Sequence, residues 1–170
     1  EHYGIPLFFD SAKNLGKHPL TRLVCAYFDL VRRNFDLQDL FTLVKNPLFC
    51  SDKRISDGFE NYCLANSANR KTVKTPFTYE HENLEEYENL RSTAVEVCSY
   101  LNGVTTFESA VIALNKMLER VNAFDKIKNL SATLTGLNRA DISAYNDHAE
   151  EKFNVVINDA VNLLGPLTLP

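Results

Sequence analysis

A cluster of basic side chains near the middle of the chain is the part of this sequence best suited to a chemical task. Arg70, Lys71 and Lys74 alternate there with hydroxyl side chains, and the aromatic residues Phe77 and Tyr79 follow. Guanidinium, ammonium and hydroxyl groups bind phosphate oxygens, and aromatic rings stack on unpaired bases. The pattern predicts contact with a nucleic-acid backbone, although a solvated loop without a ligand explains the same residues.

Two further basic residues and the charge distribution point to the same half of the chain. Lys53 and Arg54 precede the helix that leads into this loop, and we expect them to extend the patch. The net charge of −4 argues weakly against a general nucleic-acid binder. However, residues 1–76 hold 11 Lys/Arg and 8 Asp/Glu, a net charge of +3, whereas residues 77–170 hold 7 and 14, a net charge of −7. The first half is therefore the better candidate for phosphate contact.

Other reactive side chains form no recognisable catalytic site. The sequence contains no phosphate-binding glycine-rich loop, no HExxH motif and no CxxC motif. His148 has acidic neighbours at Asp147, Glu150 and Glu151, but consecutive helical residues face different directions, so a solvated face is favoured over a metal site. The glutamates within residues 82–88 resemble paired catalytic carboxylates, but an acidic first helical turn explains them. We predict no catalytic residue, metal or cofactor in these residues.

Cysteine usage and chain length limit the class of protein. The four cysteines are Cys25, Cys50, Cys63 and Cys98. None of them forms a CxxC pair, and three of the four lie in apolar helical patterns. Buried thiols are therefore favoured over a disulfide or a metal site, and we expect a reducing compartment, the cytoplasm. The sequence shows no membrane-spanning run of about 18 apolar residues and nothing that resembles a signal peptide. We expect a single domain over residues 1–170, cut from a longer protein.

Hydrophobic periodicity predicts a mainly α fold, an irregular bundle of about six helices with at most a short N-terminal strand. Four predicted helices cover approximately residues 19–33, 55–66, 84–101 and 105–121. Two more are predicted from the residues that bound them: Asp36 caps one and Pro47 ends it, and Asn138 caps the other and Gly165 ends it. Residues 5–9 are predicted as the strand and residues 67–82 as a loop. Residues 123–137 are predicted to be irregular or to hold a short helical piece.

Particular residues are expected to begin or end these helices and to face the core. Thr105 and Glu108 have the spacing of a capping box. Arg32 and Arg33 end the first helix, where the helix dipole favours cations, so a structural role is favoured over DNA contact. In the first helix the predicted inward residues are Leu20, Leu23, Val24, Tyr27, Phe28 and Val31. In the last helix they are Ile142, Tyr145, Ala149, Phe153, Val156, Ala160 and Leu163.

Five short motifs carry a resemblance to a known family. They are Leu7-Phe8-Phe9-Asp10, the helix start His18-Pro19-Leu20, the aliphatic helix from Leu23 to Val31, Asp39-Leu40-Phe41-Thr42-Leu43-Val44-Lys45, and Glu60-Asn61-Tyr62. In this order they resemble the helicase-like region of the AddB/RexB family, bacterial ATP-dependent helicase/nuclease subunits that process double-strand DNA breaks. The resemblance spans nearly all of residues 4–66, and over residues 84–170 it is a pattern of helices.

The resemblance implies a role for this chain. In AddB/RexB proteins a helicase-like core precedes a nuclease domain, and a mostly helical insertion, the counterpart of domain 2B in UvrD-like helicases, lies within the second motor domain. The chain would then be a non-catalytic accessory domain that positions DNA or packs against the motor core and the partner helicase/nuclease subunit. ATP, magnesium and the iron–sulfur cluster of the family would be bound outside these residues. The alternative, favoured by the acidic second half, is a helical protein–protein scaffold without DNA contact.

Overall fold

Seven α-helices account for most of the chain in the computed structural model, which describes residues 15–136 and 140–168. They are α1 (Pro19–Arg32), α2 (Leu37–Val44), α3 (Lys53–Ala65), α4 (Leu84–Ser99), α5 (Phe107–Arg120), α6 (Ala123–Gly136) and α7 (Ala140–Leu164). Short 3₁₀ turns cover Leu15–Lys17 and Thr72–Lys74. The described residues form no strand beyond an isolated bridge between Thr106 and Thr168. The mainly α prediction is therefore confirmed.

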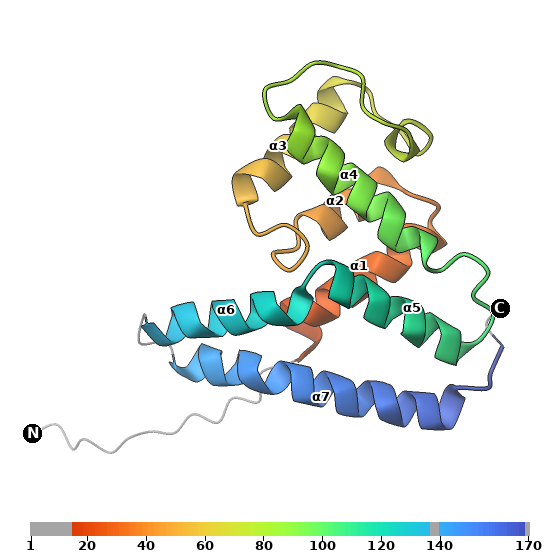
Figure 1. Ribbon diagram of the computed structural model, residues 1–170, viewed down its shortest axis with the longest axis vertical. Coiled ribbons are helices and arrows are strands. Elements are labelled where there is room, and N and C mark those ends of the chain that lie inside the picture. The colour runs from red at the N-terminus through yellow and green to blue at the C-terminus, as the bar shows by residue number, and fades with distance from the viewer. Residues whose placement is uncertain (1–14, 137–139, 169–170) are drawn as a thin grey trace, which may run out of the picture.

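The helices form two groups in space. α6 and α7 lie side by side and antiparallel, and α7 runs beneath both α5 and α6 in Figure 1. Helices α1 to α4 occupy the opposite side, with α1 next to the α5–α7 layer, α4 in contact with α5, and α3 farthest from the layer (Figure 1). The segment that joins α3 to α4 is consequently at the end of the molecule remote from α7.

Short polar side chains begin several helices. The side chain of His18 accepts a hydrogen bond from the Leu20 N–H at the start of α1. Asp36 does the same for the Gln38 N–H at the start of α2, which confirms its predicted role as N-cap. Such caps satisfy backbone donors that have no partner within the helix. Local sequence therefore sets where these helices begin.

The capping box of α5 lies one residue later than predicted. Thr106 Oγ1 accepts a hydrogen bond from the Ser109 N–H (3.2 Å), and Ser109 Oγ accepts one from the Thr106 N–H (3.1 Å). A serine hydroxyl therefore does what the carboxylate of Glu108 was expected to do. The prediction that placed Thr105 at the cap was wrong because Ser109 makes an equivalent reciprocal pair with the next threonine.

The main core lies among α1, α2, α3, α4 and α5. On α1 the buried residues include two that were not predicted to face inward, Ala26 and Leu30, whereas Val24, Phe28 and Val31 are only partly buried. Tyr27 is fully buried, and its hydroxyl donates a hydrogen bond to the Val97 oxygen of α4 (3.0 Å). The buried face of α1 is therefore shifted relative to the predicted one, and α1 packs against both α2 and α4.

The α6–α7 pair contains the largest departures from the sequence-based expectations. Residues 123–136 form a full helix, α6, where an irregular segment or a short helical piece was predicted. Ala149 of α7 is buried as predicted, but Val156 and Leu163 are 60% and 79% exposed, so their predicted inward orientation is wrong. The predicted strand at residues 5–9, the Asn138 cap and the side chains of Ile142 and Tyr145 lie outside the described residues.

Candidate nucleic-acid interface

Residues of the basic cluster are attached to the turn between α1 and α2. Asn34 and Phe35 adopt left-handed backbone conformations, with φ of 53° and 61°. This conformation is rare for a bulky residue such as phenylalanine. The Phe35 N–H donates to the Leu30 oxygen (2.8 Å) at the end of α1, and the Phe35 ring is buried in the core. Burial of the ring and closure of the helix end together stabilise this unusual turn.

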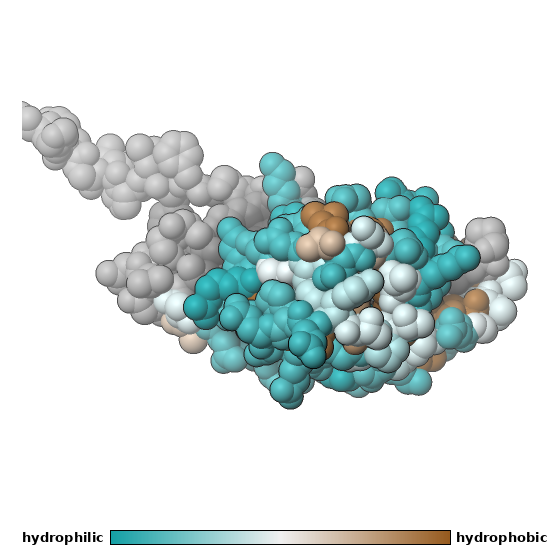
Figure 2. All heavy atoms as spheres, turned by 90° about the horizontal axis from the view of Figure 1, so that it is seen from above, coloured by the Kyte–Doolittle hydropathy of each residue, from teal (hydrophilic) through white to brown (hydrophobic). Residues whose placement is uncertain are grey.

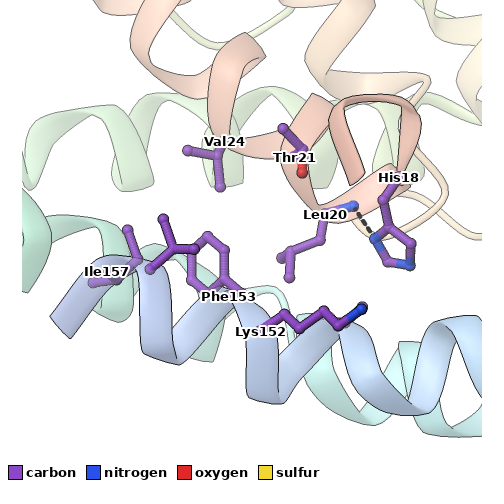
Figure 3. Close-up of a pocket in the computed structure, with 9 residues that line it drawn as sticks. His18, Leu20, Thr21, Val24, Lys152, Phe153 and Ile157 are labelled. Atoms are coloured by element: carbon purple, nitrogen blue, oxygen red, sulfur yellow. Dashed lines mark hydrogen bonds between the residues drawn. The ribbon is translucent and has the colours of Figure 1, made fainter. Parts of the chain in front are cut away.

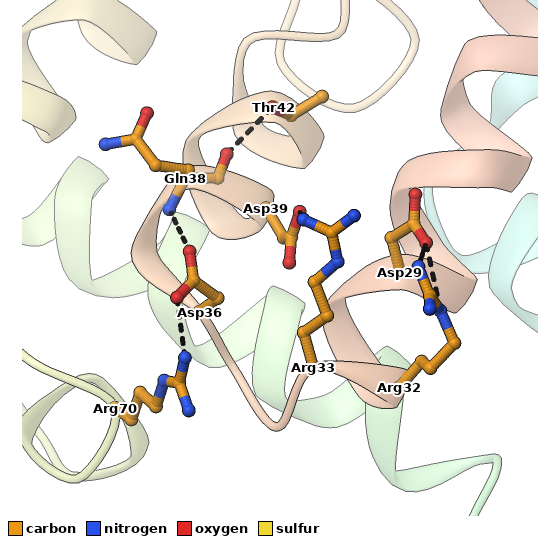
Figure 4. A network of polar contacts seen from close by, with 8 residues as sticks. All are labelled: Asp29, Arg32, Arg33, Asp36, Gln38, Asp39, Thr42 and Arg70. Atoms are coloured by element: carbon orange, nitrogen blue, oxygen red, sulfur yellow. Dashed lines mark hydrogen bonds and ion pairs between the residues drawn. The ribbon is translucent and has the colours of Figure 1, made fainter.

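Two of the predicted cationic residues attach to this turn from a segment more than 30 residues away in sequence. Arg70 Nη2 lies 2.7 Å from Asp36 Oδ2 (Figure 4). Lys74 donates to Asn34 Oδ1 (2.8 Å), and its ammonium lies 4.7 Å from the centre of the Phe35 ring. Hydrogen bonding from Arg70, supported by the Gln38 N–H, holds the pKa of Asp36 below its usual value. Both cations are exposed and held at one corner.

Arg32 and Arg33 have partners at the end of α1. Arg32 pairs with Asp29 one turn earlier (2.7 Å), and Arg33 lies 3.5 Å from Asp39 of α2 (Figure 4). These contacts agree with the structural role that the sequence favoured for both arginines. The Arg33–Asp39 pair also connects the end of α1 to α2, whereas the Arg32–Asp29 pair lies within α1.

The remaining predicted basic residues lie at two different places. Lys71 is exposed beside Arg70 and makes no ion pair with a residue that the structure describes. Lys53 and Arg54 lie at the first turn of α3, where Arg54 pairs with Asp52 (3.2 Å). The chain reaches Arg70 only after α3 has risen about 18 Å. Lys53 and Arg54 therefore do not extend the Arg70 cluster but form a separate basic site at the opposite end of α3.

The two aromatic residues of the loop have different roles. The centre of the Phe77 ring lies 4.9 Å from that of Tyr62 and 5.9 Å from that of Phe59, so the ring is partly buried and packs against the core, which leaves less of it for base stacking. The Tyr79 side chain is 60% exposed, and its backbone oxygen accepts a hydrogen bond from the Tyr62 hydroxyl (2.9 Å). Tyr79 is therefore the aromatic residue that the loop presents to solvent.

A buried arginine holds the loop on α4. Arg91 is 6% exposed and forms a bidentate pair with Glu88, one bond of which measures 2.7 Å. Arg91 also donates to the Val73 oxygen (3.3 Å), and Glu88 accepts a bond from the Phe77 N–H (3.0 Å). The hydrogen bonds from Arg91 keep the pKa of Glu88 below its usual value. Of the glutamates at the start of α4, Glu88 thus has a specific structural role that sequence spacing did not indicate.

The surface around the loop is polar. The end of the molecule formed by α3, α4 and the segment between them is largely hydrophilic, with only small hydrophobic patches (Figure 2). A surface of this kind suits a charged or polar ligand better than an apolar partner.

The thiols and acidic groups offer no other site in the described part of the chain. Cys63 and Cys98 are buried, and burial raises the pKa of each thiol to about 12. Cys50 is half-buried, whereas Cys25 is exposed, contrary to the predicted burial. No group of three or more His, Cys, Asp or Glu side chains among the described residues is arranged to hold a metal ion. Across residues 15–136 and 140–168, no helix combines the length and the apolar character needed to cross a membrane.

No family model matches this chain. Comparison with individual known proteins does identify relatives. The B subunit of an ATP-dependent helicase/deoxyribonuclease from Clostridium botulinum (strain Loch Maree / Type A3) is 25% identical over 129 residues, which are 74% of this chain and 11% of the relative. The B subunit from Lachnoclostridium phytofermentans is 31% identical over 98 residues, or 58% of this chain and 8% of the relative. The B subunit from Acetivibrio thermocellus is 36% identical over 63 residues, or 37% of this chain and 6% of the relative.

These matches confirm the resemblance that the short motifs indicated. The chain spans at most 11% of the length of these relatives. The shared region is therefore one segment of a much longer polypeptide. The chain is a distant relative of a segment of the AddB-type ATP-dependent helicase/deoxyribonuclease proteins.

Proposed function

We propose that this chain is a non-catalytic accessory domain within an ATP-dependent helicase/deoxyribonuclease complex and that it contacts DNA through Arg70, Lys71 and Lys74. The relatives are named for a component of such a complex. The observation that carries the proposal is the attachment of Arg70 and Lys74 to the α1–α2 turn, which gathers three exposed cations at one corner. On this proposal the ATP, magnesium and iron–sulfur cluster of the family are bound elsewhere in the parent polypeptide.

The existing contacts of these cations are compatible with phosphate binding. Exposed ion pairs such as Arg70–Asp36 contribute little to stability, so a phosphate can share or replace the carboxylate. A guanidinium group presents five N–H donors and matches phosphate geometry. Lys71 adds a charge with no carboxylate partner among the described residues. Lys53 and Arg54 remain candidates for a second, separate contact.

The experiment is a DNA titration of wild type and of a double variant, Arg70→Ala with Lys71→Ala, over a range of salt concentrations. Each lost phosphate contact should reduce the dependence of log K on log salt by about 0.7 for a single strand and about 0.9 for duplex DNA. The double variant should therefore bind more weakly and with a smaller salt dependence. An unchanged salt dependence contradicts the proposal.

A matched control is available on α5. Arg120 is an exposed arginine paired with Glu96 (2.9 Å), as Arg70 is with Asp36. Like Lys71, Lys116 is exposed and makes no ion pair with a described residue. The double variant Arg120→Ala with Lys116→Ala removes the same charge from another face. It should leave DNA affinity near the wild-type value.

A second candidate function, protein–protein packing, is favoured by the exposed apolar side chains of α7. Val156 and Leu163 are 60% and 79% exposed. A pocket of about 200 Å³ lies between α1 and α7, where Leu20 and Val24 face Phe153 and Ile157 (Figure 3). The occupant that fits this surface is the motor core or the partner helicase/nuclease subunit. On this candidate function the chain binds no DNA even at low salt, so the same titration separates the two.

A further inference from the structure

The exposed face of α2 is hollowed along its length. At its carboxyl end a hollow of about 360 Å³ is lined by residues that include Arg22, Thr42 and Lys45. At its amino end a shallow depression, wide open to solvent and of about 720 Å³, is lined by residues that include Arg70 and Lys71. Gln38 lines both hollows, so they meet on α2. We infer that the two hollows form one trench, the α2 trench, which holds the backbone of a single nucleic-acid strand.

The spacing of the α2 side chains gives the trench a continuous polar floor. Gln38, Thr42 and Lys45 are separated by four and three residues, a spacing that places them on one helical face. All three are exposed, while Leu40 and Leu43 of the same helix are buried. Hydrogen bonds connect Arg70, Asp36, Gln38 and Thr42 in series along this helix (Figure 4). The Gln38 side-chain amide can donate to a phosphate oxygen without adding charge, whereas the Thr42 hydroxyl already donates its proton to the Gln38 backbone oxygen.

The charges at the two ends of the trench favour an anionic chain. Four cations line it, at Arg22, Lys45, Arg70 and Lys71, against two carboxylates, Asp36 and Glu60. Lys45 is paired with Glu60 and with Asp57 behind it, and Arg70 with Asp36. Arg22 and Lys71 make no ion pair with described residues. These two cations lie at opposite ends of α2, so each is expected to bind one phosphate of the same strand.

The length of the trench matches a short stretch of one strand. The eight residues of α2 rise about 12 Å. Phosphates of one strand are separated by at least about 3.4 Å along the helix axis, so up to about four successive phosphates fit above α2. A duplex would place only its outermost phosphates on the rim. Single-stranded DNA is therefore expected to bind better than duplex DNA of the same length.

This inference rests on the proposed function and shares Arg70 and Lys71 with it, but it adds residues of its own, among them Arg22 and Thr42. The variant Thr42→Glu places a carboxylate in the middle of the trench without touching the loop cations. Its control is Thr133→Glu on α6, because both threonines are exposed and each hydroxyl donates to the backbone oxygen four residues earlier, at 2.7 Å for Thr42 and 2.9 Å for Thr133. Each variant adds one negative charge and removes one threonine hydrogen bond to the backbone of its helix.

The probe is a labelled oligodeoxythymidine at low ionic strength, with a duplex of equal length as comparison. A like charge placed beside phosphates should weaken single-strand binding by about tenfold or more, and Thr133→Glu should change it by less than about twofold. Arg22→Ala, a second variant, should reduce the salt dependence by about 0.7, equivalent to one phosphate. Thermal unfolding of each variant verifies that the fold is retained.

The outcomes separate the trench from the proposed function. If Thr42→Glu and Arg22→Ala bind like wild type while the Arg70/Lys71 variant is weakened, the trench is overturned and the proposed function stands. If wild type binds no DNA, both are overturned. If duplex binds as tightly as the single strand, the single-strand assignment is overturned.

Discussion

Arg91 of α4 donates a hydrogen bond to the backbone oxygen of Val73, at 3.3 Å, while its guanidinium is paired with Glu88. One buried arginine thus fixes the segment that carries Arg70, Lys71 and Lys74. The basic corner therefore depends on a side chain that does not itself face the proposed ligand.

Replacing Arg91 should destabilise the protein and release the loop. Arg91→Ala leaves Glu88 without its partner in a partly buried site, which should lower the free energy of unfolding by about 2–3 kcal/mol. Arg91→Lys should not restore it, because a lysine cannot reproduce the bidentate geometry. Urea unfolding measures both. Arg120→Ala, which removes an exposed ion pair, serves as the control and should lower the free energy of unfolding by about 0–1 kcal/mol. An equal loss in the two alanine variants would contradict the role given to Arg91.

His18 should make the fold sensitive to mild acid. Its Nδ1 accepts the Leu20 N–H and its Nε2 lies 3.1 Å from Asn146 Oδ1 of α7, an arrangement that requires the neutral ring. Burial lowers the pKa of His18 in the folded protein. As the pH falls below about 6.5 the unfolded chain takes up a proton and the folded chain does not, so stability decreases by up to about 1.4 kcal/mol per pH unit.

Urea unfolding of His18→Asn isolates this effect. Asparagine can still cap α1 but does not titrate. Between about pH 7 and pH 5.5 the variant should lose less stability than wild type. Equal losses in the two proteins would show that His18 does not contribute to the pH dependence.

The four cysteines should react at very different rates. Cys25 is exposed, whereas Cys63 and Cys98 are buried and have thiol pKa values raised to about 12, which leaves almost no thiolate at neutral pH. Iodoacetamide should therefore label Cys25 first, Cys50 more slowly, and the other two only in denaturant. Mass spectrometry of digested protein gives the order. Fast labelling of Cys63 or Cys98 in the native protein would contradict the packing of α3 and α4.

Asp36 combines two tasks that substitutions can separate. Its Oδ1 caps α2 through the Gln38 N–H, and its Oδ2 holds Arg70. Asp36→Asn should keep the cap and remove the ion pair, so the urea midpoint should stay near wild type while DNA affinity rises, because a negative charge is lost and Arg70 is released. Asp36→Ala should lower the urea midpoint. If Asp36→Asn binds DNA more weakly than wild type, the carboxylate is needed to position Arg70.

Several features of the fold could be predicted because they depend on neighbouring residues. The spacing of apolar side chains and the residues that cap or end a helix indicated α1 to α5 to within a few residues. Residues 123–137 were predicted to be irregular or to hold a short helical piece, whereas the structure has the 14-residue helix α6, which packs against α7. Its formation is a tertiary effect that a local pattern does not contain.

In the candidate interface, too, some features follow from the local sequence and others only from tertiary packing. Sequence alone determined a helical chain whose first half carries the positive charge, and it singled out Arg70, Lys71 and Lys74. Only the tertiary structure decided that Lys53 and Arg54 lie at the other end of α3 and that Phe77 packs against the core. It also decided that Asp36, 34 residues from Arg70, pairs with it. It also placed Arg22 and Lys45 beside Gln38. Helix caps and periodicity involve residues a few positions apart, whereas these contacts depend on how rigid helices pack, which brings together side chains that no sequence spacing relates.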